Sequence, residues 1–137
     1  MENQDVRWLQ RFANYKKAFA QLARFIANTK LNEMEEQGLI KSFEYTYELA
    51  WKTLQDLLKE KGYSDVIGPK PVIAQSFTDG YITDGEGWKK MHFSRNLTSH
   101  TYDEQTAKDI VEGIRNQYFE LLSELVQSLE KQTVKYH

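Results

Sequence analysis

Three long stretches of this chain carry apolar side chains at alternating spacings of three and four residues. This spacing places apolar side chains on one stripe of an α-helix, which must pack against another helix. The stretches are Asp5–Asn28, Glu33–Lys61 and Asp103–Thr133. Their stripes are Trp8, Phe12, Tyr15, Phe19, Leu22 and Ile26, then Ile40, Phe43, Tyr47, Ala50, Leu54 and Leu57, and finally Ala107, Val111, Ile114, Tyr118, Leu121 and Leu125. The pattern predicts an all-α protein.

The middle of the chain is broken into shorter elements. Pro71 suits the first turn of a short helix that ends before Gly80. Trp88 and Met91 then open a further helix. We therefore predict an antiparallel, up-down four-helix bundle with an extra short helix in the middle, as a single domain over residues 1–137. The alternative is an extended coiled coil, which the broken middle disfavours.

Local signals predict where several helices begin and end. Asn32 followed by Glu35 reads as a capping box, and Thr101 followed by Glu104 gives the same signal for the last helix. Gly62 suits the end of the second long helix, because glycine readily adopts the left-handed conformation found there.

The composition excludes several classes of function. The 137 residues include no cysteine, which excludes disulfides, thiolate metal sites and cysteine nucleophiles. No apolar run approaches the roughly 20 residues that a membrane helix needs, and the polar N-terminus does not resemble a signal peptide, so we expect a cytoplasmic protein without membrane contact. The net charge is −2, so any contact with RNA must be local.

No pattern in the sequence predicts a metal or cofactor site. The glycines are too sparse for a phosphate-binding loop, and His92, His100 and His137 lack the spacing of zinc ligands. Glu44 and Glu48 lie four residues apart on one helix face, but no Glu-x-x-His partner accompanies them. We expect these two carboxylates to be solvated or ion-paired.

The candidate functional segment is residues 94–102, which carries the pattern R-N-x-x-x-H-x-Y. Its four motif residues are Arg95, Asn96, His100 and Tyr102. No acidic residue occurs between Gly87 and Tyr102, whereas Lys89, Lys90 and Arg95 are positively charged. This local positive region, on a chain with a net negative charge, suits an anionic ligand such as phosphate.

The spacing of Arg95 and His100 requires a break in the helix. Residues five apart on a continuous helix point about 140° apart, so these two side chains would diverge. They can converge if one helix ends near Leu97 or Thr98 and another starts after His100. We expect a helix junction here, beside a free and positively polarised helix N-terminus.

These residue types suit chemistry at a phosphodiester. Arg95 can clamp phosphate oxygens, and His100 can exchange a proton with a ribose 2′-hydroxyl or a leaving oxygen. Asn96 could orient His100 or a phosphate, and Tyr102 could hydrogen-bond a phosphate or be modified. The alternative is structural: Arg95 caps helix carbonyls, His100 fills the junction and Tyr102 belongs to the core.

The helical order and the motif together resemble the HEPN superfamily, and within it the nucleotidyltransferase substrate-binding proteins. The resemblance covers nearly the whole chain and rests on Arg95-Asn96-x-x-x-His100-x-Tyr102, preceded by the Trp-Lys-Lys-Met helix. It implies an all-α homodimer that forms a complex with a minimal nucleotidyltransferase, often as the toxin of a toxin–antitoxin pair.

The resemblance also implies roles for the motif residues. Arg95 and His100 would be the catalytic residues of a metal-independent endoribonuclease, with Asn96 assisting, and Tyr102 would be nucleotidylated by the partner. Three hypotheses follow: a substrate-binding subunit of a nucleotidyltransferase, an endoribonuclease, and a structural bundle whose motif arose by chance. The substrate could be RNA, a nucleotide or another acceptor.

Overall fold

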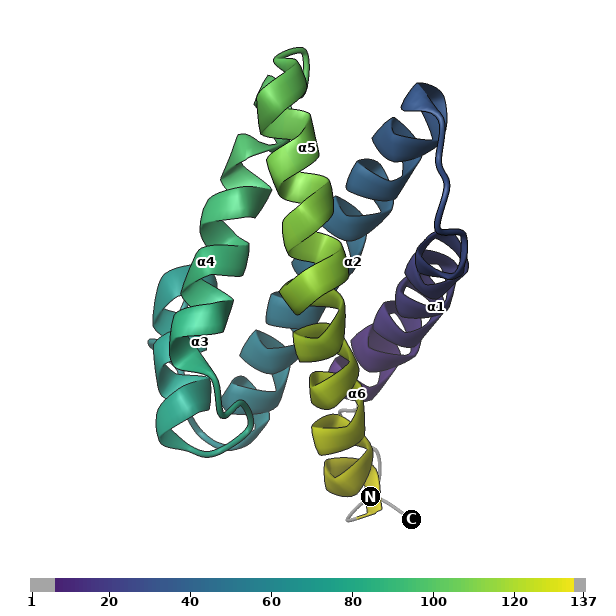
Figure 1. Ribbon diagram of the computed structural model, residues 1–137. Helices are drawn as coiled ribbons and strands as arrows, with labels where there is room; N and C mark the ends of the chain where they lie inside the picture. The colour runs from purple at the N-terminus through teal and green to yellow at the C-terminus, as the bar shows by residue number, and fades with distance from the viewer. Residues whose placement is uncertain (1–6, 135–137) are drawn as a thin grey trace.

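The computed structural model describes residues 7–134, in which four helical columns run alternately up and down (Figure 1). The columns are α1 (Arg7–Ala27), α2 (Glu33–Glu60), α4 (Gly85–Asn96) and the run of α5 (Glu104–Gly113), η2 (Ile114–Tyr118) and α6 (Phe119–Thr133). The extra short helix, α3 (Pro69–Thr78), lies beside α4. These residues contain no strand, so the predicted four-helix bundle with one short extra helix is confirmed.

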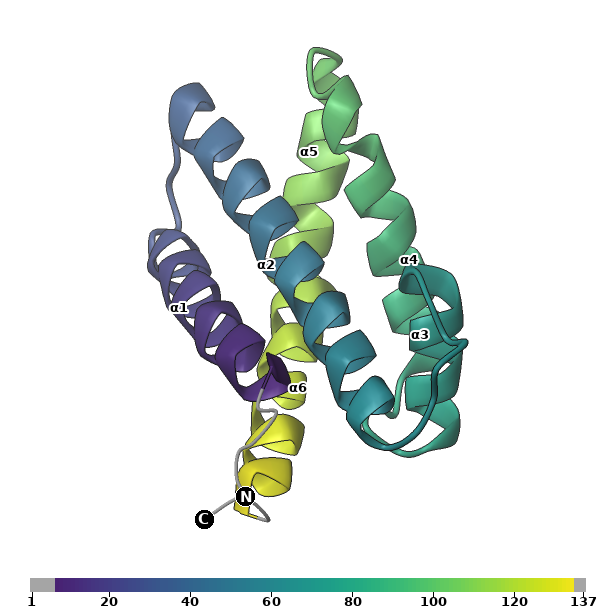
Figure 2. The same cartoon turned by 180° about the vertical axis from the view of Figure 1, so that it is seen from behind.

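Helix α2 is the central column of the bundle (Figure 2). It contacts all the other α-helices. The contacts with α3 lie near the C-terminal end of α2. All six predicted stripe residues of α2 are buried, as are the six of the α5–α6 column. In α1, Phe19 and Ile26 are only partly buried. None of the helices in residues 7–134 is long and apolar enough to span a lipid bilayer.

Polar contacts fix the ends of α2. The Asn32 side chain accepts a hydrogen bond from the Glu35 backbone N–H at 2.8 Å, and the Glu35 carboxylate accepts one from the Asn32 N–H at 2.9 Å, so the predicted capping box is confirmed. At the other end Gly62 has a φ of 105°, and the Tyr63 N–H donates to the Leu58 carbonyl, which is the expected glycine-terminated geometry.

Helix α4 begins earlier than the sequence predicts. It starts at Gly85 rather than at Trp88, because the Asp84 side chain accepts a hydrogen bond from the Gly87 N–H at 2.9 Å and acts as the N-cap. The two glycines of this segment therefore belong to the first turn of the helix.

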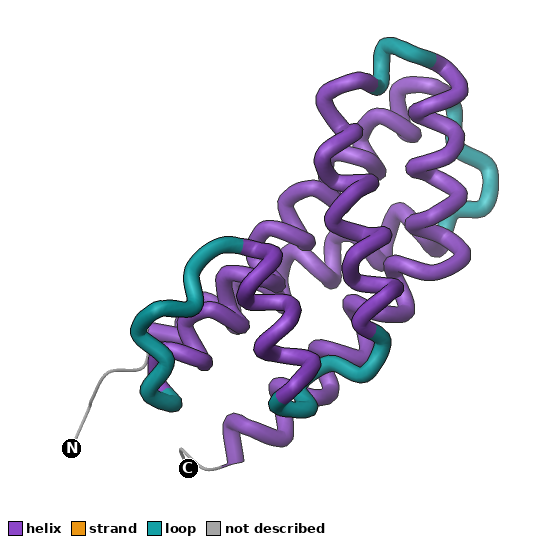
Figure 3. The backbone as a smooth tube through the Cα atoms, turned by 90° about the vertical axis from the view of Figure 1, so that its left-hand side faces the viewer, coloured by secondary structure: helices purple, strands orange, loops and turns teal. Residues whose placement is uncertain are grey.

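The last column is not the uninterrupted α-helix that the sequence predicts. A π-helical turn, η2, separates α5 from α6 (the tube view in Figure 3 shows one continuous helical path). Within this turn the Tyr118 ring packs on Gly113, and a Cβ added to Gly113 would lie only 2.6 Å from a ring carbon, so a side chain at this position would clash. The Tyr118 hydroxyl then reaches the Ser94 hydroxyl at 2.7 Å and joins this column to α4.

The π-helical turn also presents Arg115 to the end of α1. The guanidinium donates to the carbonyl oxygens of Ile26 at 3.2 Å and Asn28 at 2.7 Å. A cation at this position satisfies exposed carbonyls and complements the negative end of the α1 dipole.

We predict that Asn32→Ala lowers the free energy of unfolding by about 1 kcal/mol, because the capping box at the start of α2 is lost. Urea unfolding followed by circular dichroism measures this change. Asn32→Ser is the matched control, since serine also caps helices, and it should stay close to the wild-type stability. Equal losses for the two variants would contradict a capping role.

Candidate functional site

The motif segment lies at a break between two helices, as predicted. Helix α4 ends at Asn96, a 3₁₀ turn, η1, covers Leu97–His100, and α5 begins at Glu104. The Thr98 hydroxyl donates to the Arg95 carbonyl at 2.7 Å and closes the end of α4. Arg95 therefore lies on the last turn of α4, and His100 lies at the end of the 3₁₀ turn.

The start of α5 differs from the prediction. Thr101 is not its N-cap, because its hydroxyl bonds the Gln37 side chain at 3.1 Å while the chain is still in a turn. Asp103 caps the helix instead, accepting hydrogen bonds from the Thr106 hydroxyl at 2.8 Å and the Thr106 backbone N–H at 2.9 Å. These bonds lower the pKa of the Asp103 carboxyl. The prediction of a free N-terminus on this helix is therefore wrong, because the Asp103 carboxylate occupies the N-terminus of α5.

The Arg95 guanidinium is held by two carboxylates of α2. Its Nε lies 2.7 Å from Glu48 Oε2, and its Nη2 lies 3.3 Å from Glu44 Oε2. The expectation that Glu44 and Glu48 are ion-paired or solvated is confirmed, and their partner is the motif arginine. The positive region expected from the sequence is thus offset by acids from a distant segment. A phosphate could contact Arg95 only by competing with these carboxylates.

His100 and Tyr102 lie next to each other on the surface. The His100 Nδ1 lies 3.2 Å from the Tyr102 hydroxyl, and the two rings meet edge to face with centroids 5.8 Å apart. Tyr102 is 84% exposed, so the alternative that it belongs to the core is excluded. Its ring borders a surface groove of about 480 Å³ that Met34 and Lys108 also line.

Asn96 contacts a histidine other than the predicted one. Its side-chain nitrogen lies 3.4 Å from His92 Nε2, while the His92 Nδ1 lies 2.8 Å from the Tyr47 hydroxyl. No hydrogen bond joins Asn96 to His100 within residues 7–134. Burial raises the pKa of the Tyr47 hydroxyl, and burial together with the nearby Lys70 lowers the pKa of His92. Both effects favour the neutral form of the His92 imidazole.

The sequence analysis did not assign a role to His92, Tyr47 or Lys70. Tyr47 falls on the apolar stripe of α2 and reads as a core residue. The spacing of His92 and Asn96 was an available signal, because residues four apart on a helix share one face. The hydrogen bond between Tyr47 of α2 and His92 of α4 had no signal in the sequence, because these two residues are 45 positions apart.

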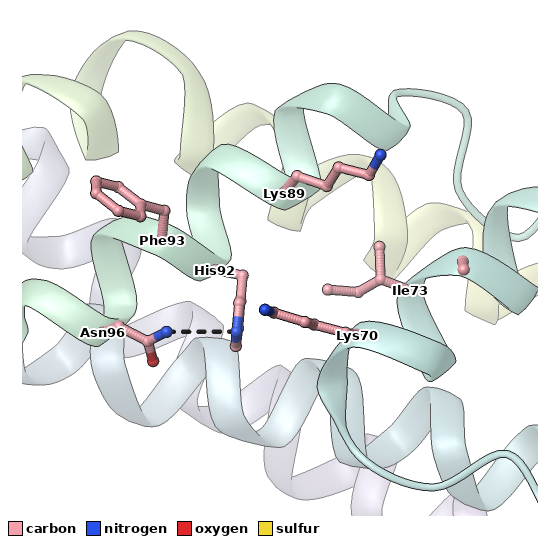
Figure 4. A pocket seen from close by; sticks show the side chains of 7 residues that line it. Lys70, Ile73, Lys89, His92, Phe93 and Asn96 are labelled. Atoms are coloured by element: carbon pink, nitrogen blue, oxygen red, sulfur yellow. Dashed lines mark hydrogen bonds between the residues drawn. The ribbon is translucent and has the colours of Figure 1, made fainter.

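The two lysines of α4 share one groove, and Lys89 also borders a second hollow. Lys89 lines a cavity between α3 and α4 together with Asn96 (Figure 4). Lys90 lines another groove, of about 820 Å³, where Asp109 and Glu112 of α5 lie opposite it. The predicted site residues thus lie in three places: Arg95, His100 and Tyr102 at the junction, Asn96 in the cavity, and Lys90 in the groove, with Lys89 on the ridge that borders both the cavity and the groove.

Known proteins resemble this chain in sequence and in fold. The family model described as "Nucleotidyltransferase substrate binding protein like" matches residues 10–131, which include the motif. A Thermus thermophilus protein of known structure is 32% identical, with a TM-score of 0.77 over 84% of this chain and 98% of that one.

Two further relatives come from Haemophilus influenzae. A solved structure described as revealing the fold of a substrate binding domain of a nucleotidyltransferase is 24% identical, with a TM-score of 0.67 over 90% of this chain and 96% of that one, and shows the same fold. A curated protein named "Probable ribonuclease HepT" is 35% identical over 74 residues, which span about half of each chain (51% of both).

The family match extends over nearly the whole chain and contains both the helix break and the residues placed on either side of it. The protein therefore belongs to the nucleotidyltransferase substrate binding protein-like family.

Proposed function

We propose that this protein is the helical, substrate-binding partner of a minimal nucleotidyltransferase, and that the two form a cytoplasmic toxin–antitoxin pair. The observation that carries the proposal is the family match over residues 10–131. The sequence adds support, because it has no phosphate-binding loop of its own and would depend on a partner for nucleotide transfer.

Tyr102 is the residue through which the partner would act. Its hydroxyl is exposed and touches His100, so a transferred nucleotide would cover the His100 imidazole. The nucleotide would add a phosphate to the surface, where it could exchange with Glu44 or Glu48 for the Arg95 guanidinium. Modification would then block both motif residues at once.

A second function, metal-independent endoribonuclease activity, is favoured by the curated relative named as a probable ribonuclease. His100 would accept the proton of a ribose 2′-hydroxyl while the 2′-oxygen attacks phosphorus. The bond to the 5′-oxygen then breaks, that oxygen receives a proton from an imidazolium, and a 2′,3′-cyclic phosphate remains. Arg95 would stabilise the charge on the phosphoryl oxygens.

This reaction needs an acid as well as a base, and a homodimer would supply both. Two copies facing each other would bring two His100 imidazoles to one phosphate, one neutral and one protonated. The third hypothesis, a chance motif on a structural bundle, is disfavoured because the family match includes residues 94–102.

We predict that co-expression with its partner, a minimal nucleotidyltransferase from the same organism, attaches a nucleotide to Tyr102 and that the two proteins co-purify. Intact-mass and peptide mass spectrometry measure the adduct. Tyr102→Phe should remove the adduct, leave ribonuclease activity largely intact and make that activity insensitive to the partner.

Tyr45→Phe is the matched control for this experiment, because Tyr45 is also exposed but lies on α2. Tyr45 should carry no nucleotide in the wild-type protein, and the Tyr45→Phe variant should carry the same adduct on Tyr102 as the wild type. An adduct on another residue of the Tyr102→Phe protein, with silencing retained, would contradict the assignment.

We predict that His100→Ala and Arg95→Gln each lower RNA cleavage by about 10² or more, because proton transfer and charge stabilisation each contribute that much. The measurement is the rate at which a labelled RNA acquires a 2′,3′-cyclic phosphate end. Arg24→Gln, at an exposed position of α1, is the control and should cleave at the wild-type rate. Unchanged cleavage by both motif variants would rule out this activity for the motif.

A further inference from the structure

A cavity between α3 and α4 has the form of a ligand site and is separate from the His100–Tyr102 pair. Its volume is about 410 Å³, within the range of small-molecule sites, and it is lined by side chains from residues 70–74 of α3 and residues 89–96 of α4. Figure 4 shows Lys70 and Ile73 approaching from α3, opposite His92 and Asn96 of α4. The lining residues are Lys70, Ile73, Ala74, Lys89, His92, Phe93 and Asn96.

The charge of this cavity suits an anion. Two of its seven lining residues are lysines and none is acidic. Within residues 7–134 the one carboxylate that pairs with Lys89 is that of Glu86, at 3.8 Å, and both side chains are largely exposed, so this ion pair offers little competition to a ligand. No carboxylate pairs with Lys70 in the described part of the chain, and its ammonium points toward His92 (Figure 4).

The walls of the cavity suit a flat, apolar group. Ile73 and Ala74 form its α3 side, and Phe93 of α4, 65% exposed, stands at its rim, where it also borders the groove of about 820 Å³. An aromatic side chain in this position leaves a large apolar surface in water, and stacking a base against such a ring contributes about 1–3 kcal/mol.

A fixed pair of polar groups lies between the charged and apolar parts. A hydrogen bond between the Tyr47 hydroxyl and His92 Nδ1 holds the imidazole in one orientation. Its Nε2 faces Asn96 across 3.4 Å, a long contact that a ligand can replace with a shorter one. The neutral imidazole and the amide together can hydrogen-bond a sugar hydroxyl or a ring nitrogen.

We propose that this cavity binds a nucleoside phosphate, with Lys70 and Lys89 holding the phosphates, Phe93 stacking on the base and His92 with Asn96 bonding the nucleoside. The proposal rests on the proposed function, because it names the class of substrate that this subunit would hold for the nucleotidyltransferase. The cavity and the partner's target residue, Tyr102, would then be different sites.

The test is isothermal titration of the full-length protein with ATP, adenosine and tripolyphosphate, at fixed ionic strength without added divalent metal. Lys70→Gln should weaken ATP binding about tenfold or more, since it removes a charge-assisted contact. Phe93→Ala should weaken the binding of ATP and of adenosine but leave the binding of tripolyphosphate unchanged. Lys17→Gln, which removes the same charge from an exposed position on α1, should bind ATP as the wild type does.

Histidine NMR locates the site, because the chain has only three histidines. ATP should shift the His92 resonances and leave those of His100 in place. Without ligand, Lys70→Gln should raise the pKa of His92, since the positive charge that disfavours the imidazolium is removed. The mutated lysines and Phe93 are all exposed, so these variants should keep the wild-type circular dichroism.

Several results would overturn the inference. They are an absence of ATP binding by the wild type, equal ATP affinity of the Lys70→Gln and Lys17→Gln proteins, and shifts at His100 instead of His92. Tripolyphosphate binding as tight as ATP, with no effect of Phe93→Ala, would refute the nucleoside assignment. Co-purification with the nucleotidyltransferase is measured separately. A protein that does not bind ATP can therefore be distinguished from one that does not bind the nucleotidyltransferase.

Discussion

Burial of one stripe of α2 is the interaction on which the rest of the structure depends. The stripe side chains of this helix are 0–3% exposed, and they pack against residues from α1 and from the α5–α6 column. The Phe43 ring stacks on Tyr118 at 5.6 Å, and the Tyr47 ring packs on Trp88 at 6.3 Å. Each large buried ring contributes substantial apolar area, so this helix fixes where its neighbours can lie.

The same helix organises the polar groups of both candidate sites. One edge of the α2 stripe carries Glu44, Tyr47 and Glu48, and this edge faces α4. Glu44 and Glu48 hold Arg95 at the junction, and the Tyr47 hydroxyl holds His92 in the α3–α4 cavity. The junction and the cavity are therefore built on one scaffold, and a shift of α2 relative to α4 would change both.

The fold was predictable from the sequence because its signals are local. Apolar spacing gave the long helices, and the Asn32 capping box and Gly62 gave the ends of α2. The site was only partly predictable. The helix break after Asn96 follows from its poor helix formers, but the carboxylates on Arg95 and the tyrosine on His92 come from residues 45 to 51 positions earlier. The π-helical turn was missed because the apolar spacing does not indicate that the Tyr118 ring packs on Gly113.

The two carboxylates on Arg95 have a consequence for selectivity among anions. An incoming anion must replace contacts that the guanidinium already has, so a monovalent ion such as chloride gains no net attraction at this position. A phosphodiester within a longer polyanion is also fixed by contacts elsewhere, and those contacts can offset the cost of displacing Glu44 and Glu48. The ion pair would thus make Arg95 discriminate among anions by their size and valence.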